Sequence, residues 1–262
     1  MSLEIKGTPE GATPDSGGRE SEKRRRVVVF GGTTEGREEA LRLFRTGEDV
    51  LVSVTSGYAR ALLPEGIPCH VGALNREEMM HFLREEAPGL VIDATHPFAA
   101  LVTENLRACC QALSIPLQRV ARPQSAGKWR DSVLRVRDAE AAALALRDTS
   151  GNVLLTTGSR TLAVYAAEVP KERLFVRVLP TSEALSLCDT VGILPSHIIA
   201  MQGPFSAALN AALYDLLEIR VLVTKDSGKR GGVEEKAVPA LSRGILVILI
   251  DRPEEKTCGE SR

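Results

Sequence analysis

The sequence is poor in aromatic residues, in net charge and in long apolar segments. Only 4% of its 262 residues are aromatic, and the formal net charge is −1. Few rings leave little material for stacking on nucleic acid bases, and balanced charge argues against bulk electrostatic binding of a polyanion. No apolar run approaches the roughly 20 residues of a membrane span. We therefore expect neither a nucleic acid partner nor a membrane span.

Patterned cysteines and a secretion signal are also missing. The five cysteines show no C-x-x-C spacing, and the four histidines are scattered without matched spacing. This pattern indicates neither a disulfide framework nor a zinc site, so we predict no metal. The N-terminal residues hold no apolar stretch typical of a secretory signal. Together these features favour reduced thiols and a cytoplasmic location.

The sequence does contain a regular alternation of short apolar runs and helical patterns from residue 27 onwards, which is typical of parallel α/β sheets. The first set of runs lies at 27–30, 50–54, 68–71, 90–94 and 116–121. The second set lies at 152–155, 174–178, 197–201, 220–224 and 245–250. Two successive five-strand units predict two Rossmann-like α/β domains with parallel sheets and an interdomain cleft. A single long doubly wound sheet is the alternative.

The polar segment 121–131 separates the two sets and holds the only tryptophan. We place the domain boundary there, with a first domain at 27–122 and a second at 123–253. Residues 1–26, rich in Gly, Pro, Ser and charge, are predicted to be a disordered leader, and 254–262 a tail. Helices are expected at 35–45, 75–86, 98–113, 138–148, 159–167, 181–189, 205–217 and 234–243, with Pro239 kinking or shortening the last one.

Small and polar residues follow the predicted strands at one edge of each sheet. In the first half these sequences are GGTTEG, TSGY and THPFA, and in the second half TTGSR, QGPFS and KDSGKRGG. Ligands of open parallel sheets bind beyond the carboxyl ends of the strands, where these loops meet. The opposite connections, such as residues 85–89, resemble plain turns. One cleft lined from both domains is the expected binding site.

The turn GGTTEG resembles a dinucleotide-binding fingerprint with one change. Gly31 and Gly36 occupy the first and third glycine positions of G-x-G-x-x-G, while Thr33 stands at the middle one. The glycines permit a tight turn with exposed N–H groups, and Thr33 offers a hydroxyl to a phosphate. Glu35 would be repelled by a pyrophosphate, so it favours the helix dipole or binds a hydroxyl or an amide instead. The predicted cofactor residues in this turn are Gly31, Gly32, Thr33, Thr34 and Glu35; an ordinary glycine turn is the alternative.

The end of the second strand bears on which cofactor binds. An NAD site usually places an Asp or Glu there to bind the ribose 2′-hydroxyl, but residues 53–58 are all neutral. Ser53 and Thr55, with Arg60 nearby, would receive a 2′-phosphate. We therefore expect NADPH, with NADH possible.

The fourth strand is followed by His96 and Pro97. Pro97 suits a first helical position, which would leave His96 beside a helix N-terminus at the cleft. His96 is predicted to contact the nicotinamide or the substrate; a hydrogen bond to nearby backbone is the alternative.

Three loops of the second half are suited to anions. Ser159 is expected to cap a helix, and Pro204 to open the next one. The loop 225–232 holds three cations beside Gly and Ser; a solvated, flexible loop is its alternative. The predicted substrate residues are Thr157, Gly158, Ser159, Gln202, Gly203, Phe205, Lys225, Ser227 and Gly228. His96 and Lys225 are the catalytic candidates, although a hydride from the cofactor requires no particular catalytic side chain.

Six strings in order, GGTTEGRE, LVIDATHPFA, LLTTGSR, LFVRVLPT, IIAMQGPFS and VLVTKDSGKRGG, resemble the precorrin-6A reductase family, including its cobalt-precorrin-6A members, over roughly residues 27–252. The resemblance implies two Rossmann-like domains and reduction of one macrocycle double bond by a reduced nicotinamide, giving the 6B form in cobalamin biosynthesis. It also implies a tetrapyrrole bearing many carboxylates in the cleft, and it leaves the oligomeric state open.

Two other functions compete with this interpretation. A non-catalytic NADP-binding sensor or scaffold would retain GGTTEG without needing polar loops in the second half. A short-chain reductase or sugar-nucleotide epimerase is disfavoured, because none of Tyr58, Tyr165 and Tyr214 has a lysine four residues later.

Overall fold

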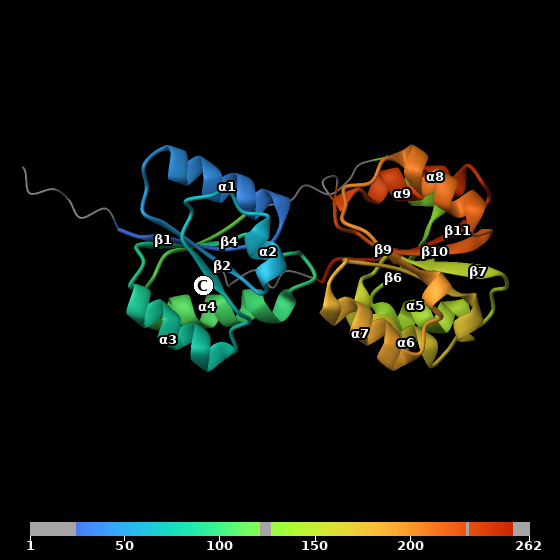
Figure 1. Ribbon diagram of the computed structural model, residues 1–262, viewed down its shortest axis with the longest axis horizontal. Helices are drawn as coiled ribbons and strands as arrows, with labels where there is room; N and C mark the ends of the chain where they lie inside the picture. Colours follow the sequence, from blue (N-terminus) through green and yellow to red (C-terminus); the bar gives the residue numbers. More distant parts are fainter. Residues whose placement is uncertain (1–24, 121–126, 229–230, 254–262) are drawn as a thin grey trace, which may run out of the picture.

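The computed structural model describes residues 25–120, 127–228 and 231–253, and they form two α/β domains (Figure 1). The first sheet is parallel throughout and has the strand order β3-β2-β1-β4-β5. Its strands are β1 Val27–Phe30, β2 Val50–Val54, β3 Cys69–Val71, β4 Leu90–Asp93 and β5 Leu117–Arg119. Strands β1 and β2 are buried over their whole length because helices cover both faces, which explains their unbroken apolar runs.

The second sheet is also parallel, with the order β6-β11-β10-β7-β8-β9. Its strands are β6 Leu134–Val136, β7 Asn152–Leu155, β8 Leu174–Val178, β9 Ile198–Ala200, β10 Ile219–Lys225 and β11 Leu246–Ile250. Without β6, this order repeats that of the first sheet. The prediction of two parallel-sheet domains is therefore confirmed, and the single-sheet alternative is wrong.

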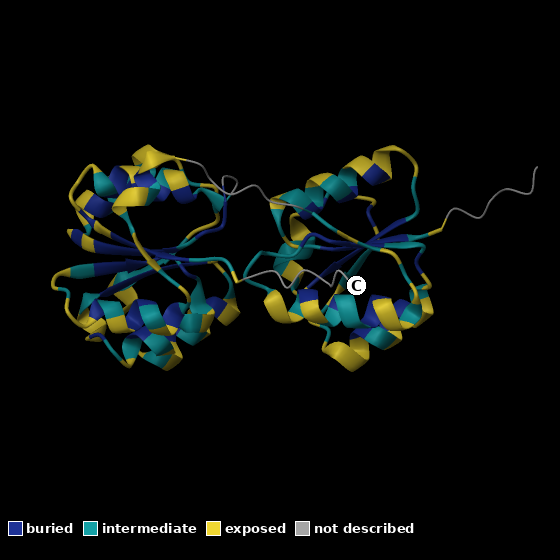
Figure 2. Cartoon of the chain, turned by 180° about the vertical axis from the view of Figure 1, so that it is seen from behind, coloured by how far each residue is buried: buried dark blue, intermediate teal, exposed yellow. Residues whose placement is uncertain are grey.

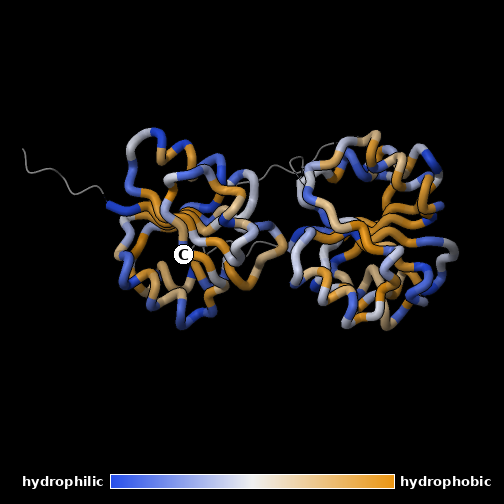
Figure 3. Tube along the Cα trace, viewed as in Figure 1, coloured by the Kyte–Doolittle hydropathy of each residue, from blue (hydrophilic) through white to orange (hydrophobic). Residues whose placement is uncertain are grey.

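Helices cover both faces of each sheet (Figure 1). In the first domain, one face packs on α1 Thr34–Arg45 and α2 Gly57–Ala61, and the other on α3 Arg76–Glu86 and α4 Ala100–Leu113. In the second domain, α5 Ala139–Leu146, α6 Leu162–Ala166 and α7 Ser182–Val191 cover one face, and α8 Ala207–Leu216 and α9 Val233–Leu241 the other. The buried residues gather in the sheets and on the inner helix faces (Figure 2), where the trace is most hydrophobic (Figure 3).

Three helix starts differ from the predictions. Pro97 lies in a turn before α4 rather than at its first position. Ser159 opens a short 3-10 helix, Ser159–Thr161, and makes no capping bond to α6. Pro204 follows a cis peptide bond, and Ser206 caps α8 by accepting a hydrogen bond from the backbone N–H of Leu209. The loops before α4 and α8 are therefore longer than the sequence pattern indicated, and the helix predicted from 159 begins with a 3-10 turn.

Pro239 lies inside α9 without ending it. A proline cannot donate to the carbonyl four residues earlier, here that of Glu235. The side-chain amide of Asn210 in α8 donates to this carbonyl instead, with an Nδ2 to O distance of 2.9 Å. The helix therefore tolerates the proline because a neighbouring helix satisfies the carbonyl.

Several predictions concern residues outside the described ranges, namely most of the leader, the domain boundary between residues 122 and 123, the tail 254–262, and Lys229 and Arg230. Within the described ranges, no helix combines the length and apolar character that crossing a bilayer requires. In that same part of the chain, no group of three His, Cys, Asp or Glu side chains is arranged to hold a metal ion.

Candidate active site

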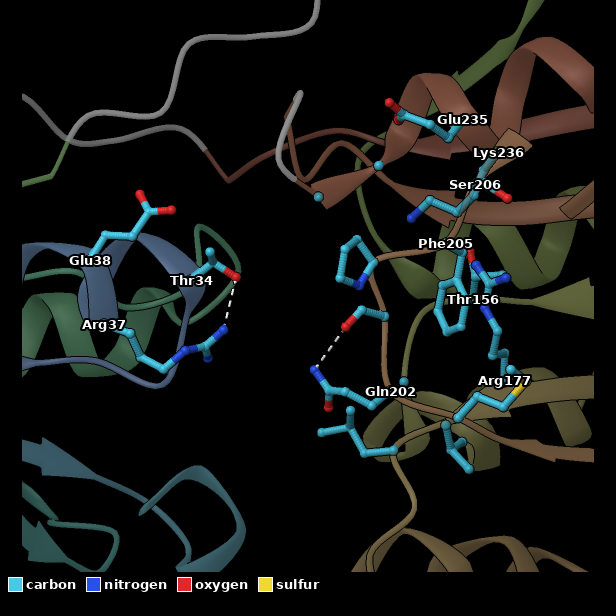
Figure 4. Close-up of a pocket in the computed structure, with 18 residues that line it drawn as sticks. Thr34, Arg37, Glu38, Thr156, Arg177, Gln202, Phe205, Ser206, Glu235 and Lys236 are labelled. Carbon is cyan, nitrogen blue, oxygen red and sulfur yellow. Dashed lines mark hydrogen bonds between the residues drawn. The ribbon is translucent and has the colours of Figure 1, made fainter. Parts of the chain in front are cut away.

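The carboxyl-terminal edges of the two sheets border one cleft. It consists of two pockets with volumes of about 890 and 780 Å³. They are continuous, because Thr34, Gln202 and Lys236 line both of them. Figure 4 shows Thr34 and Arg37 of α1 on one side of the larger pocket, with Gln202, Phe205, Arg177 and Lys236 on the other. In each sheet the strand order reverses at one point, which lies between β1 and β4 in the first sheet and between β7 and β10 in the second. Ligands of open parallel sheets usually bind at this point, beyond the carboxyl ends of the strands.

Thr33, at the middle position of the glycine turn, has a structural use that corrects its predicted role. Its hydroxyl donates to the carbonyl of Ala94 at 2.8 Å and accepts from the N–H of Gly36 at 3.2 Å. The single hydroxyl hydrogen is therefore committed, and Thr33 cannot also donate to a phosphate as expected. Instead it caps α1 and ties the loop after β1 to the loop after β4.

The glycines of this turn have different structural roles: Gly36 allows close packing, and Gly32 leaves the backbone exposed to the pocket. A side chain at Gly36 would lie 3.2 Å from both the Ala94 Cβ and the Gly31 Cα, so the third glycine allows close packing of α1 on β4. Gly32 has a φ of +146°, and a Cβ there would meet nothing within 4 Å. Gly32 lines the smaller pocket, so its backbone is exposed to whatever binds.

Most of the predicted cofactor residues line the smaller pocket: Gly32, Thr33, Thr34, Glu35, Thr55 and His96. Gly31 and Ser53 do not. Ser53 is buried within β2, with its hydroxyl 3.4 Å from His70 Nδ1. Arg37, Ser56 and Tyr58 also line this pocket but were not predicted as cofactor residues, although the sequence TSGY had indicated that this loop borders the cleft. Ser56 is the N-cap of the short helix α2, which places Tyr58 at the cleft.

His96 lies beside Phe98, which forms part of the contact between the domains. His96 Nδ1 accepts from the N–H of Phe98 at 3.3 Å, so the backbone hydrogen bond left open by the sequence is present, and His96 also lines the smaller pocket. Phe98 packs against the core of the second domain, and Lys225 Nζ lies 5.2 Å from its ring centre. A second contact joins the Tyr58 hydroxyl to Gln202 Oε1 at 2.6 Å.

The predicted substrate residues are divided between the two pockets. Thr157, Ser159, Lys225 and Ser227 line the smaller one, Gly203 and Phe205 line the larger one, and Gly158 and Gln202 line both. Gly228 lines neither.

Lys225 is more constrained than expected. Its Nζ donates to the carbonyl of Thr157 at 2.6 Å, and burial together with nearby Arg160 lowers its pKa. It therefore ties the loop after β10 to the loop after β7, as Thr33 ties the corresponding loops of the first domain.

Two buried cations of the larger pocket, Arg177 and Lys236, were missed in the sequence. Their exposed fractions are 7% and 9%. Burial is the main cause that lowers the pKa of Lys236, to about 7; Arg177 lowers it further, and Glu235 acts in the opposite direction. Burial also lowers the pKa of Arg177. The only signal for Arg177 was its charge within the apolar run LFVRV.

The geometry defines a two-domain α/β protein with a ligand cleft between the carboxyl edges of two parallel sheets. Comparison with known proteins narrows this class. The family model described as precorrin-6x reductase CbiJ/CobK matches residues 26–261. The chain belongs to this family and is therefore an oxidoreductase of cobalamin biosynthesis.

Individual relatives agree with this assignment. The chain is 35% identical to a cobalt-precorrin-6A reductase of Salmonella typhimurium, over 89% of this chain and 90% of the relative. It is 31% identical to a precorrin-6A reductase of Rhodobacter capsulatus, over 87% and 88%. A solved structure of a CobK precorrin-6A reductase superposes with a TM-score of 0.75 at 29% identity, covering 89% of this chain and 90% of that one. The comparisons give no support to a non-catalytic sensor or scaffold.

Proposed function

We propose that the protein reduces one carbon–carbon double bond of precorrin-6A, or of its cobalt-containing form, with a reduced nicotinamide nucleotide, giving the 6B form. The observation that carries the proposal is the shared cleft, which brings the glycine turn of one domain opposite the polar loops of the other. Membership of the reductase family supports the macrocycle as substrate, and relatives of similar identity act on both its metal-free and cobalt forms by name. NADPH is the proposed cofactor, with NADH as the alternative.

The residues around the glycine turn fit the pyrophosphate of such a cofactor. The N-terminus of α1 and the open backbone of Gly32 both point to an anion site. Thr34 takes the role expected of Thr33, because its hydroxyl accepts from Arg37 Nη2 at 3.1 Å and keeps its own hydrogen to donate. Glu35 is unfavourable for a phosphate and suits a ribose hydroxyl or the nicotinamide amide.

The loop after β2 fits the adenosine ribose. Thr55 and Ser56 line the pocket with hydroxyl groups, and residues 53–60 include no carboxylate. A 2′-phosphate would therefore meet hydroxyls rather than a repelling acid, which supports NADPH over NADH; Arg60 lies in the same short helix α2 but does not line the pocket.

The chain's contribution to the reaction is alignment of the two ligands. The cofactor supplies a hydride, and the acceptor carbon must lie within about 3–3.5 Å of its donor carbon. The contacts of Tyr58 with Gln202 and of Phe98 with Lys225 fix the separation of the domains, and Phe205 offers the macrocycle an apolar face. A protonated ring nitrogen makes the conjugated system accept hydride as an iminium does, so no single side chain is required as an acid.

Turnover tests the proposal directly. Metal-free and cobalt-loaded precorrin-6A are each mixed anaerobically with NADPH or NADH, and the loss of reduced nicotinamide is compared with formation of the 6B product. We expect at least one macrocycle to be reduced, faster with NADPH. Absence of turnover in all four combinations, with folded protein, would contradict the proposed function.

A further inference from the structure

Arg177 and Lys236 are two buried cations without an acidic hydrogen-bond partner. Two other arginines with low exposure bind carboxylates: Arg119 pairs with Asp93, and Arg130 pairs with Asp226 at 2.7 Å. Arg177 instead donates to the neutral amide of Asn210 at 2.7 Å and lies over the ring of Phe205 at 4.2 Å. An unpaired buried charge is costly, and the one carboxylate in this wall, that of Glu235, cannot balance both cations, so the pair indicates a binding site for an anion.

Lys236 projects into the cleft from α9 and lines both pockets (Figure 4). In the described structure no acceptor lies within hydrogen-bond distance of its ammonium group. Its own backbone carbonyl is taken, because it accepts from the Tyr214 hydroxyl at 3.0 Å. The neighbouring charged groups are Arg177 on β8, the carboxylate of Glu235 on α9, and the Tyr214 phenol, whose pKa burial raises. Across the pocket are Arg37 and Glu38 of α1.

The position of Arg177 is fixed by a chain of hydrogen bonds that begins at Pro239. The carbonyl of Glu235, left without its helical donor by the proline, accepts from Asn210 Nδ2, and so does the carbonyl of Ser206 at 2.9 Å. Both hydrogens of the amide are therefore used, and its oxygen must face Arg177. The remaining N–H donors of Arg177 are left for a ligand. Hydrogen bonds thus hold the guanidinium group in a fixed position at this wall of the pocket.

We propose that Arg177 and Lys236 together bind one carboxylate of the tetrapyrrole, which makes them specificity-determining residues of the second domain. This inference rests on the proposed function. Carboxylate oxygens supply the acceptors that both cations lack, and the ring of Phe205 beside them suits the flat macrocycle that would carry the carboxylate. A nucleotide phosphate has the same anionic chemistry, but the glycine turn on the opposite wall already provides a place for one.

The test compares wild type with Lys236→Met, which keeps the side-chain volume and removes the charge. Uroporphyrin I, an octacarboxylate tetrapyrrole, and NADPH are titrated separately against each protein. We expect the porphyrin dissociation constant to rise about 10- to 100-fold in the variant, because a charge-assisted bond is lost, with NADPH affinity changed less than about twofold. Lys171→Met, at an exposed lysine of the 3-10 helix Lys171–Arg173, is the matched control and should change neither affinity.

Proton uptake separates a binding role from a structural one. Calorimetry at pH 8 in buffers of different ionisation enthalpy should show that wild type takes up a proton on binding the porphyrin, because the carboxylate favours the charged lysine. Lys236→Met should lose this uptake. With precorrin-6A as substrate, the variant should raise KM at least tenfold and leave kcat within about threefold.

The outcomes distinguish the two proposals. If wild type binds the porphyrin and Lys236→Met binds it equally well, the carboxylate site is wrong while the proposed function stands. A variant that loses affinity for NADPH alone would assign the cations to the nucleotide phosphate and also overturn this inference. If wild type neither binds the tetrapyrrole nor turns over precorrin-6A, the proposed function fails and this inference fails with it.

Discussion

Lys236→Met should stabilise the free protein and flatten its pH dependence, although the same change is expected to weaken ligand binding. In the folded protein the pKa of Lys236 is about 7, against an ordinary value of 10.5, mainly because the side chain is buried. Between these two values the unfolded chain binds a proton that the folded chain lacks. Stability of wild type therefore rises as the pH increases from about 7 towards 10.5, and the destabilisation is complete below about pH 7.

The size of the effect follows from the same two values. Each pH unit between them corresponds to about 1.4 kcal/mol, so the full interval gives an upper limit of about 5 kcal/mol. Local relaxation and water entry reduce it, and we expect Lys236→Met to be about 2–4 kcal/mol more stable at pH 7. The difference should shrink steadily by pH 9.5.

Urea denaturation between pH 7 and 9.5 measures this difference. The single tryptophan, Trp129, is buried in the same core cluster as Ala237 of α9, so its fluorescence reports unfolding of the second domain. Lys171→Met controls for the loss of a lysine on the surface. If the free energies of unfolding of wild type and Lys236→Met change in parallel over this pH range, burial of Lys236 does not destabilise the folded protein. The proposed anion site would then lose its energetic support.

Three further changes test the first domain. Gly32→Val places a β-branched side chain at a φ of +146° on the cleft wall, and NADPH affinity measured by fluorescence titration should fall more than about tenfold; unchanged affinity would remove this turn from the site. Thr33→Val removes the hydroxyl shared by Gly36 and Ala94, so denaturation should show a loss of about 1–3 kcal/mol, while Thr33→Ser restores most of it. Asp93→Asn uncouples a buried ion pair with Arg119 and should cost about 3–5 kcal/mol; a loss below 1 kcal/mol would show that the pair contributes little.

The strands of this fold were predictable because most of them lie in the interior of a sheet. Each of the ten predicted apolar runs overlaps an observed strand, since helices on both faces of a sheet require side chains that are apolar without alternation. Strand β6 was missed, although the equally short edge strands β3, β5 and β9 were predicted. Its two apolar residues are separated by Arg135 and followed by Arg137 and Asp138, so the sequence shows no continuous apolar run there.

The loops of the site were predictable for a topological reason, whereas its buried charges were not. The carboxyl edges of parallel strands gather in one place, so the sequences after β1, β4, β7 and β10 could be assigned to a cleft without coordinates. Arg177 and Lys236 lie within a strand and a helix, where a charge is ordinarily interpreted as solvent-facing. Their burial depends on α8, and on the meeting of Asn210 with a carbonyl released by Pro239, which no local pattern encodes.

In each domain one side chain connects two neighbouring loops at the edge of the cleft, but the two domains use different residues. Thr33 joins the loops after β1 and β4, and Lys225 joins the loops after β7 and β10, in each case by donating to a backbone carbonyl of the partner loop. Both contacts hold the cleft walls in place; the Thr33 hydroxyl has no further hydrogen to donate, whereas the Lys225 ammonium group keeps two of its three N–H donors. Recognition must then depend on groups whose donors remain unused, and on the second domain the strongest of these are the two buried cations. Under the proposed function both kinds of group are needed, because fixed walls would set the distance between the donor and acceptor carbons, while Arg177 and Lys236 would fix the position of the macrocycle between them.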